Sequence, residues 1–483
     1  MSRGSPDVTE ETPLLNGGID EENAATGKTK PTPLPKFQLA CLLFIQVCEP
    51  MSSQFIHPFI NELIYESGIS GGDRKRVGYY TGLVISSYFL AESVSVFFWG
   101  RLSDRIGRRP VIFIGLCAVT TSLVVLGFSK TLLSLMVARA ISGGLSGNVG
   151  ILKGMMAEIT DESNQARAFS FSPVVAAIGQ VVAPMVGGHL SHPVERFPSV
   201  FRDSKLFATY PYLLPCLIIA ILPVIGNVIN IFFLKESLKK KPPVAQSLES
   251  VDSDSTLVVK PPPKAPSLSA LLTPRVKSAV LNYSFVAFVG NMQNFMQPLF
   301  QSTPIALGGL SLKPQDIGSI LGLLGLYNCI IQGLVFAPAH QRLGTTRMFR
   351  ICLSAYAIIF SGWPLVNSIA RKNGTAAGPA LILYTAQLSL VPFGRMAFSC
   401  SNIFLTSAAP SRSSLGATVG LGQTFASLCR SIGPSLAAAL FAVSIEQSLL
   451  GGYLVYVVLI CIVFVALLAS FTLPSVIRRA SVE

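Results

Sequence analysis

Twelve mostly apolar stretches, each long enough to cross a bilayer, constrain this chain more than any other feature of it. A spanning helix needs about 20 predominantly apolar residues. Half of the residues are hydrophobic and only 13% are charged, which leaves too little polar surface to coat a soluble globule of this size. We therefore predict an all-α, multi-pass membrane protein with transmembrane helices over residues 37–64, 78–99, 110–128, 132–157, 167–190, 211–234, 278–305, 315–337, 349–369, 379–408, 414–443 and 453–473.

A polar segment between the sixth and seventh stretches divides the chain into two halves. It contains a lysine run at 239–241 and a proline run at 261–263, a composition typical of a flexible linker. A weak repeat relates the halves, because the Arg-Ile-Gly at 105–107 is echoed by the Arg-Leu-Gly at 342–344. Two pseudo-symmetric six-helix bundles around a midplane cavity are a common plan of secondary transporters. The predicted division is a disordered tail (1–36), an N-terminal bundle (37–234), a linker (235–277), a C-terminal bundle (278–474) and a short tail (475–483).

The loop charges predict the orientation of the chain. Arginines and lysines concentrate in the connections after even-numbered spans and at the C-terminus, which places both termini in the cytoplasm. The basic run at 74–76, in the loop after span one, is an exception. Asn373 lies in the sequon Asn373-Gly374-Thr375 of a predicted exoplasmic loop, where glycosylation can occur. Leu14 and Leu15 follow two glutamates, as in signals read by sorting adaptors. Plasma membrane and vacuolar membrane both stay open, as does an inert tail.

The loop between spans two and three is compact and strongly charged. It reads Gly-Arg-Leu-Ser-Asp-Arg-Ile-Gly-Arg-Arg over residues 100–109, and we expect the glycines to form a tight turn. Span four carries Arg139 followed by Gly143 and Gly147. Span five carries Ser170, Gly179, an Ala-Pro pair at 183–184 and a Gly-Gly pair at 187–188.

From residue 37 to residue 474 the chain resembles the major facilitator superfamily, and these three motifs carry the resemblance. It is most similar to the twelve-span drug:proton antiporters, especially the zinc-induced-facilitator-like proteins and their fungal relatives. The first motif implies a gate that latches the two halves in the outward-facing state. Simple positive-inside topology is the alternative. The predicted gating residues are Gly100, Asp104, Arg105, Gly107, Arg108, Arg109 and Glu158, with Arg167 as a further candidate partner of the carboxylates.

The motif in span five resembles the one that marks antiporters in the family. Pro184 removes a backbone donor, and small residues allow a partner helix to approach closely. The functional interpretation is a hinge or leak barrier, and ordinary small-residue packing is the alternative. The residues concerned are Gly179, Pro184, Gly187 and Gly188.

Two charges deep in the apolar stretches are candidates for proton coupling. Arg139 lies seven residues into span four and Glu49 twelve residues into span one from the other side, about 10 Å and about 18 Å deep. An arginine at such depth requires a partner or an aqueous cavity. We predict that Glu49 and Arg139 pair and that release of Glu49 allows it to take up a proton. A purely structural ion pair is the alternative.

Several polar side chains in spans one and seven are candidates for lining a substrate cavity. They are Gln46, His57, Asn291, Gln293, Asn294 and Gln297, and helix-to-helix hydrogen bonding is the competing interpretation. The many amides suggest a neutral or cationic amphiphile as substrate. Further charges within the spans are Glu92, Lys153, Arg395 and Arg430, of which Glu92 and Lys153 are a possible pair.

The sequence contains no phosphate-binding loop, no His/Cys cluster with metal spacing and no catalytic triad spacing. We therefore predict that the chain is no enzyme and needs no metal or cofactor, with a proton gradient as its energy source. The predicted function is export of a small organic compound, such as a drug or secondary metabolite, in exchange for protons by alternating access. A proton symporter for nutrient uptake and a non-transporting nutrient receptor are the alternatives. The expected partners are the substrate, protons and membrane lipids, without nucleic acid, and the expected working unit is a monomer.

Overall fold

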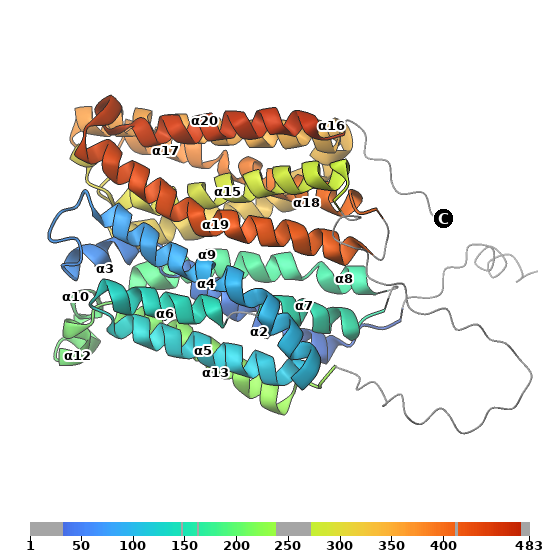
Figure 1. Ribbon diagram of the computed structural model, residues 1–483. Coiled ribbons are helices and arrows are strands. Elements are labelled where there is room, and N and C mark those ends of the chain that lie inside the picture. The colour runs from blue at the N-terminus through green and yellow to red at the C-terminus, as the bar shows by residue number, and fades with distance from the viewer. Residues whose placement is uncertain (1–31, 146–147, 162–163, 238–271, 411–413, 475–483) are drawn as a thin grey trace, which may run out of the picture.

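The computed structural model describes residues 32–145, 148–161, 164–237, 272–410 and 414–474. The N-terminal half is built from long helices joined by short ones (Figure 1). Its helices are α2 (Lys36–Gln54), α3 (Ile60–Glu66), α4 (Val77–Ile106), α5 (Arg108–Phe128), α6 (Leu132–Gly144), α7 (Asn148–Glu158), α8 (Gln165–Phe169), α9 (Ser172–Leu190), α10 (Pro193–Arg196), α11 (Pro198–Phe201), α12 (Lys205–Thr209) and α13 (Leu213–Phe232).

The C-terminal half repeats this plan with fewer breaks. Its helices are α15 (Pro274–Ser302), α16 (Pro314–Asn373), α17 (Pro379–Leu388), α18 (Val391–Ser407), α19 (Leu415–Glu446) and α20 (Leu454–Ala469). The long α16 contains two spans, because Gly344 interrupts it with φ 74° and ψ 161°. Gly107, between α4 and α5, has φ 106° and ψ 159°. The two positions of the sequence repeat thus share one backbone conformation, which favours glycine.

The helices follow the twelve predicted spans, with differences at several boundaries. Seven helical segments among the described residues are by themselves long and apolar enough to cross a membrane. Residues 100–106, expected in a turn, instead continue α4, and only Gly107 leaves the helical conformation. The helix continues because 101–106 contain no proline or glycine that would end it. Span one is also interrupted, since residues 55–59 form a turn between α2 and α3.

The two ends of the helical bundle differ in how the halves meet. We call the end that contains Gly107 and Gly344 the motif end, and the end that contains Arg76 and Glu446 the closed end. α4 and α19 pack together, as do α9 and α16, and these pairs join the N-terminal half to the C-terminal half. In Figure 1, α4 and α19 separate towards the end at which α7 and α8 lie.

A cluster of buried aromatic side chains holds the C-terminal half together near the closed end. The Trp363 ring lies 5.8 Å from Phe300, 5.5 Å from Phe360 and 5.5 Å from Tyr456, measured between ring centroids. All four side chains are at most 1% exposed. These side chains come from α15, α16 and α20, so their packing holds α15 against α16 and α20.

Candidate functional site: a two-ended transport path

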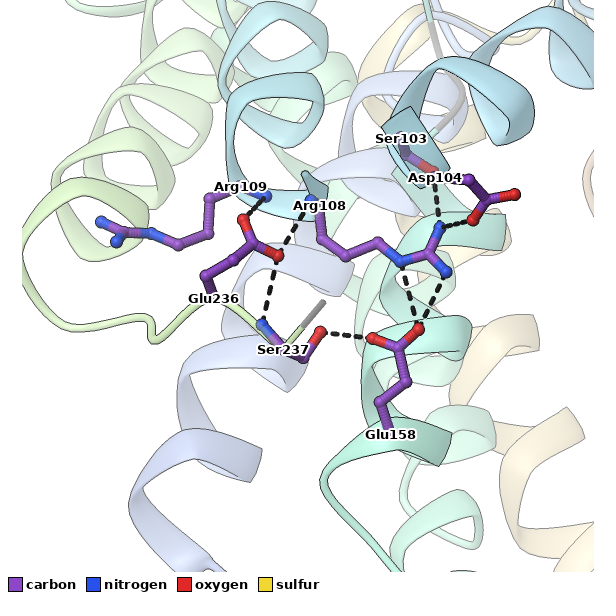
Figure 2. Close-up of polar contacts among 7 residues, drawn as sticks. All are labelled: Ser103, Asp104, Arg108, Arg109, Glu158, Glu236 and Ser237. Carbon is purple, nitrogen blue, oxygen red and sulfur yellow. Dashed lines mark hydrogen bonds and ion pairs between the residues drawn. The ribbon is translucent and has the colours of Figure 1, made fainter. Parts of the chain in front are cut away.

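Arg108 is the centre of a charged network at the motif end (Figure 2). Its Nη1 donates to Ser103 Oγ at 2.6 Å and pairs with Asp104 Oδ1 at 2.7 Å, while its Nη2 lies 2.8 Å from Glu158 Oε1. The Arg108 side chain is only 14% exposed. Charge-assisted bonds of this kind are stronger than neutral ones, so they fix the end of α4 against α5 and α7. The described contacts of this network do not include the Arg167 side chain.

Glu236 closes the same network from beyond α13. Its two carboxylate oxygens accept the backbone N–H groups of Arg108 at 3.0 Å and Arg109 at 3.1 Å. Neighbouring Ser237 donates its hydroxyl to Glu158. The first N–H groups of a helix have no partner within it, and a carboxylate there is favourable. Residues 235–237 were expected to begin a flexible linker, but they are bound at the motif end, and sequence reasoning missed Glu236.

Arg109 binds the end of a different helix. Its guanidinium donates to the carbonyl oxygens of Asn230 and Ile231 at 2.7–3.1 Å, and Asn230 donates back to the Arg109 carbonyl at 3.1 Å. A cation is favourable at the C-terminus of α13. Arg105 is exposed, and Gly100 lies inside α4. The described network contains no residue of the C-terminal half, so in this conformation it braces the N-terminal half and does not latch the two halves.

Glycines bring the halves together at the closed end. A Cβ at Gly188 of α9 would overlap the Pro314 carbonyl and the backbone of Gly318 in α16. A Cβ at Gly82 of α4 would overlap Ala438 of α19. Only glycine allows backbones to approach this closely. The α9–α16 contact at Gly188 and the α4–α19 contact at Gly82, the two glycine crossings, therefore close this end by direct approach of the helix backbones.

The other residues of the span-five motif pack mainly within the N-terminal half. Gly179 faces Pro50 of α2, and Gly187 faces the carbonyl of Phe55 in the turn after α2. The carbonyl of Pro184 lies against Gly318. The motif thus serves helix packing in this conformation, and its role as a hinge stays a prediction.

Polar contacts between the halves reinforce the closed end. Arg76 Nε lies 3.1 Å from Glu446 Oε1, and Asn61 Nδ2 donates to Ser302 Oγ at 2.8 Å. His189 lies 3.3 Å from Ser319 Oγ. Arg76 belongs to the basic run that departs from the loop-charge pattern, and a carboxylate neutralises it here. Every hydrogen bond and ion pair described between the halves lies in the part of the bundle nearest this end or at the midplane, so in this conformation the halves are joined at the closed end and not at the motif end.

A small cavity of about 30 Å³ lies between the halves. Three of the six predicted cavity residues line it, namely His57, Asn294 and Gln297. The other three bond elsewhere: Gln46 accepts from Ser172, Asn291 donates to the carbonyl of Arg430, and Gln293 donates to Gln297. The cavity also contains Gln54, Gln180 and Arg395, which sequence reasoning did not assign to it. His57 lies in the turn after α2.

The predicted pair of Glu49 and Arg139 does not form. Arg139 is 3% exposed and stacks on the Tyr88 ring, with its Cζ 4.6 Å from the centroid. Glu49 lies instead in the field of Lys153 and Arg430. The interhelical register, which one sequence does not contain, decides this partner choice. Glu92 lies in the field of Glu49 and Arg430, and no ion pair within 4.0 Å joins these four charges in the described structure.

A second titratable group of residues lies at the closed end, outside the spans. Both carboxylate oxygens of Glu66 lie within 3.1 Å of His192 Nε2, and the Tyr212 hydroxyl donates to Glu66 at 2.6 Å. The hydrogen bond to Glu66 raises the pKa of His192, although burial opposes this. Burial favours a neutral Glu66, but the bonds from His192 and Tyr212 outweigh it and lower the pKa of the carboxyl.

Two packed helical bundles with charged residues at the midplane define a class of polytopic membrane transporters. The model of the Major Facilitator Superfamily matches residues 42–434, and the chain belongs to that family. It is a transporter and not an enzyme. The twelve-helix fold and the family predicted from the sequence are confirmed, and so is the place of the chain as an integral multi-pass membrane protein.

Relatives of similar length occur in fungi and plants. The multidrug transporter mfsB of Aspergillus fumigatus is 28% identical over 500 residues, which cover 89% of this chain and 82% of that protein. The efflux pump azaK of Aspergillus niger is 27% identical, with 99% of this chain and 98% of that protein covered. ZINC INDUCED FACILITATOR 1 of Arabidopsis thaliana is 26% identical, with 90% and 91% covered.

The fold also matches a solved structure. A bacterial homolog of the human lysosomal transporter Spinster has a TM-score of 0.67 and is 15% identical. The match covers 92% of this chain and 98% of that chain. At this identity the likeness concerns the fold.

Proposed function

We propose that this transporter exports a small organic compound in exchange for protons by alternating access. The observation that carries the proposal is the placement of Glu49 and Glu92 in the N-terminal half within the field of Arg430 in the C-terminal half. A nearby cation favours an ionised carboxylate. When the halves move, the separation from Arg430 changes, and the two carboxylates then bind or release protons.

The position of these charges fits such coupling. Ser86 of α4 accepts the backbone N–H of Ser435 in α19 at 3.1 Å, so the two antiparallel helices meet there. Glu92 lies six residues beyond Ser86 towards the motif end, and Arg430 lies five residues before Ser435. Both charges are therefore about 8–9 Å along their helices from the contact, on the side where the helices separate. The names of the fungal relatives support export of organic compounds.

Vesicles that contain the purified protein test the exchange. They are prepared acid inside, and rhodamine 110 or its methyl ester, rhodamine 123, is added outside. An exchanger accumulates dye as protons leave, whereas a symporter requires acid outside and a receptor accumulates nothing. Protein-free vesicles correct for passive uptake.

Glu49→Gln should abolish uptake driven by the gradient at an unchanged protein level, because the amide does not titrate. Glu195→Gln changes an exposed carboxylate outside the spans and serves as the matched control. Unchanged uptake by Glu49→Gln would exclude Glu49 as the coupling group. Accumulation only with acid outside would replace antiport by symport.

The membrane orientation is also a proposal. We infer that the motif end and both termini face the cytoplasm, as the arginine-rich connections at that end favour. Asn373 is exposed at the end of α16, near the closed end, where glycosylation would place it outside the cytoplasm. Sensitivity of the purified protein to an endoglycosidase tests this assignment. Leu14 and Leu15, the proposed contacts for sorting adaptors, lie outside the described residues.

A further inference from the structure

The charges in the interior of the spans, more than two residues from either end, do not balance. Four of them are cationic and two are anionic: Arg139, Lys153, Arg395 and Arg430 against Glu49 and Glu92. Glu49 lies in the field of Lys153 and Arg430, and Glu92 lies in the field of Arg430. Two arginines, Arg139 and Arg395, are left over. A guanidinium in the interior of a membrane protein is costly without a partner or water. The surplus therefore marks a place where an anion would be stabilised.

Arg395 is the surplus arginine that lines the cavity between the halves. One of its nitrogens, Nη2, donates to Asn294 Oδ1 at 2.9 Å, and Nη1 donates to Gln180 Oε1. Both partners are neutral amides, and no carboxylate lies within 4.0 Å of Arg395 in the described structure. Arg139 differs, since it is stacked on Tyr88 and does not line this cavity.

A second donor lines the same cavity. Gln297 is 2% exposed, and its Nε2 has no hydrogen-bond partner in the described structure. Its Oε1 is occupied by Gln293, whose Nε2 lies 2.6 Å away. An unpaired buried donor costs free energy, which a bound acceptor would recover. A cavity of about 30 Å³ has room for a group of one or two water-sized units, such as a carboxylate head.

We propose that this cavity binds an anionic group, a carboxylate, sulfonate or phosphate, of the transported compound. Arg395 supplies the charge and the guanidinium N–H groups that its bonds to Gln180 and Asn294 do not use, and Gln297 supplies an amide N–H. This replaces the neutral or cationic substrate expected from the amide content. Because Gln180 comes from α9 and Arg395 from α18, an anion here would bind at a contact between the halves. The assignment of the anion as cargo rests on the proposed transport function.

Binding to the purified protein without a proton gradient tests the site separately from transport. Rhodamine 110 has a free carboxylate, and its methyl ester, rhodamine 123, differs only by masking that group. Fluorescence anisotropy should show that the acid binds at least about tenfold more tightly than the ester. Equal affinity, preference for the ester or no binding of the acid would overturn the proposal. If the acid binds selectively but neither dye is transported, the site stands and the proposed proton-coupled export falls.

Variants then assign the preference to Arg395. Arg395→Gln should remove the tenfold preference by weakening the binding of the acid, and Arg395→Lys should keep part of it, because lysine keeps the charge and loses the planar fork. Arg202→Gln, which removes an exposed arginine outside the cavity, should bind as the native protein does. Persistence of the full preference in a folded Arg395→Gln protein would exclude Arg395. Should that variant not fold, the comparison of acid and ester on the native protein still decides the proposal.

Discussion

Glu236→Ala should destabilise the N-terminal half by removing the carboxylate that caps α5. Helix α5 begins Arg108-Arg109-Pro110, and Pro110 has no N–H. The Gly107 N–H donates to the Ser103 carbonyl, so Glu236 accepts the two N–H groups that remain at this helix start. Loss of a capping side chain costs about 0.5–2 kcal/mol, and loss of an anion near a helix N-terminus about 0.3–1 kcal/mol. These effects overlap, so we expect about 1–2 kcal/mol.

The melting temperature in detergent measures this effect, with size-exclusion chromatography detecting the folded protein that remains after heating. In a domain of about 200 residues, such a loss lowers the melting temperature by roughly 2–8 °C. Asp203→Ala, which removes an exposed carboxylate on another loop, is the control and should melt as the native protein does. Ser237→Ala should cost less, because it breaks one bond to Glu158 and leaves the cap intact. An unchanged melting temperature in Glu236→Ala would refute the capping argument.

Two further predictions concern the closed end. Gly188→Leu should prevent closure, because its side chain would occupy the backbone of α16. A disulfide between Asn61→Cys and Ser302→Cys, in a background without native cysteines, should then fail to form, whereas Gly333→Leu, with open space around it, should leave it intact. His192→Gln should lower the melting temperature at a pH of about 5.5, and the difference should shrink towards a pH of about 9. The bond to Glu66 raises the pKa of His192. The stabilisation that protonated His192 gives the folded protein is therefore complete below the ordinary pKa of histidine, and it is lost as pH rises through the raised pKa of His192. A difference independent of pH would contradict this.

The sequence predicted the positions of the helices better than it predicted which side chains contact each other. Span positions follow from hydrophobic length, and the repeat of Gly107 and Gly344 indicated two halves. That the two glycines share a backbone conformation that favours glycine is seen only in the structure. The prediction that Glu49 and Arg139 pair was wrong, because the depth of a residue along a helix does not determine which way its side chain faces. Arg395 was seen as a charge but not placed in the cavity for the same reason.

Glu236 was missed for a different physical reason. Its neighbourhood is polar and rich in lysine, which is typical of a linker, and the local sequence has no periodicity that would indicate binding. Its partners are backbone N–H groups about 128 residues earlier in the chain, and any sequence can present such groups. A proline at the third position of α5 was the available signal, because it leaves a first turn with few donors that one carboxylate can satisfy.

The closed end combines two kinds of contact that should respond differently to change. Arg76 and Glu446 are exposed, so their pair is worth at most about 1 kcal/mol, and the hydrogen bond between Asn61 and Ser302 contributes a similar amount. Reversing a two-state equilibrium from 1:99 to 99:1 takes about 5.5 kcal/mol, which a bound substrate, with the proposed proton binding, would supply against contacts this weak. The polar contacts therefore set the balance between states, and losing one should shift it by about fivefold or less. The glycine crossings determine whether this end can close at all, because no rearrangement of a side chain removes an added Cβ from the backbone facing Gly188.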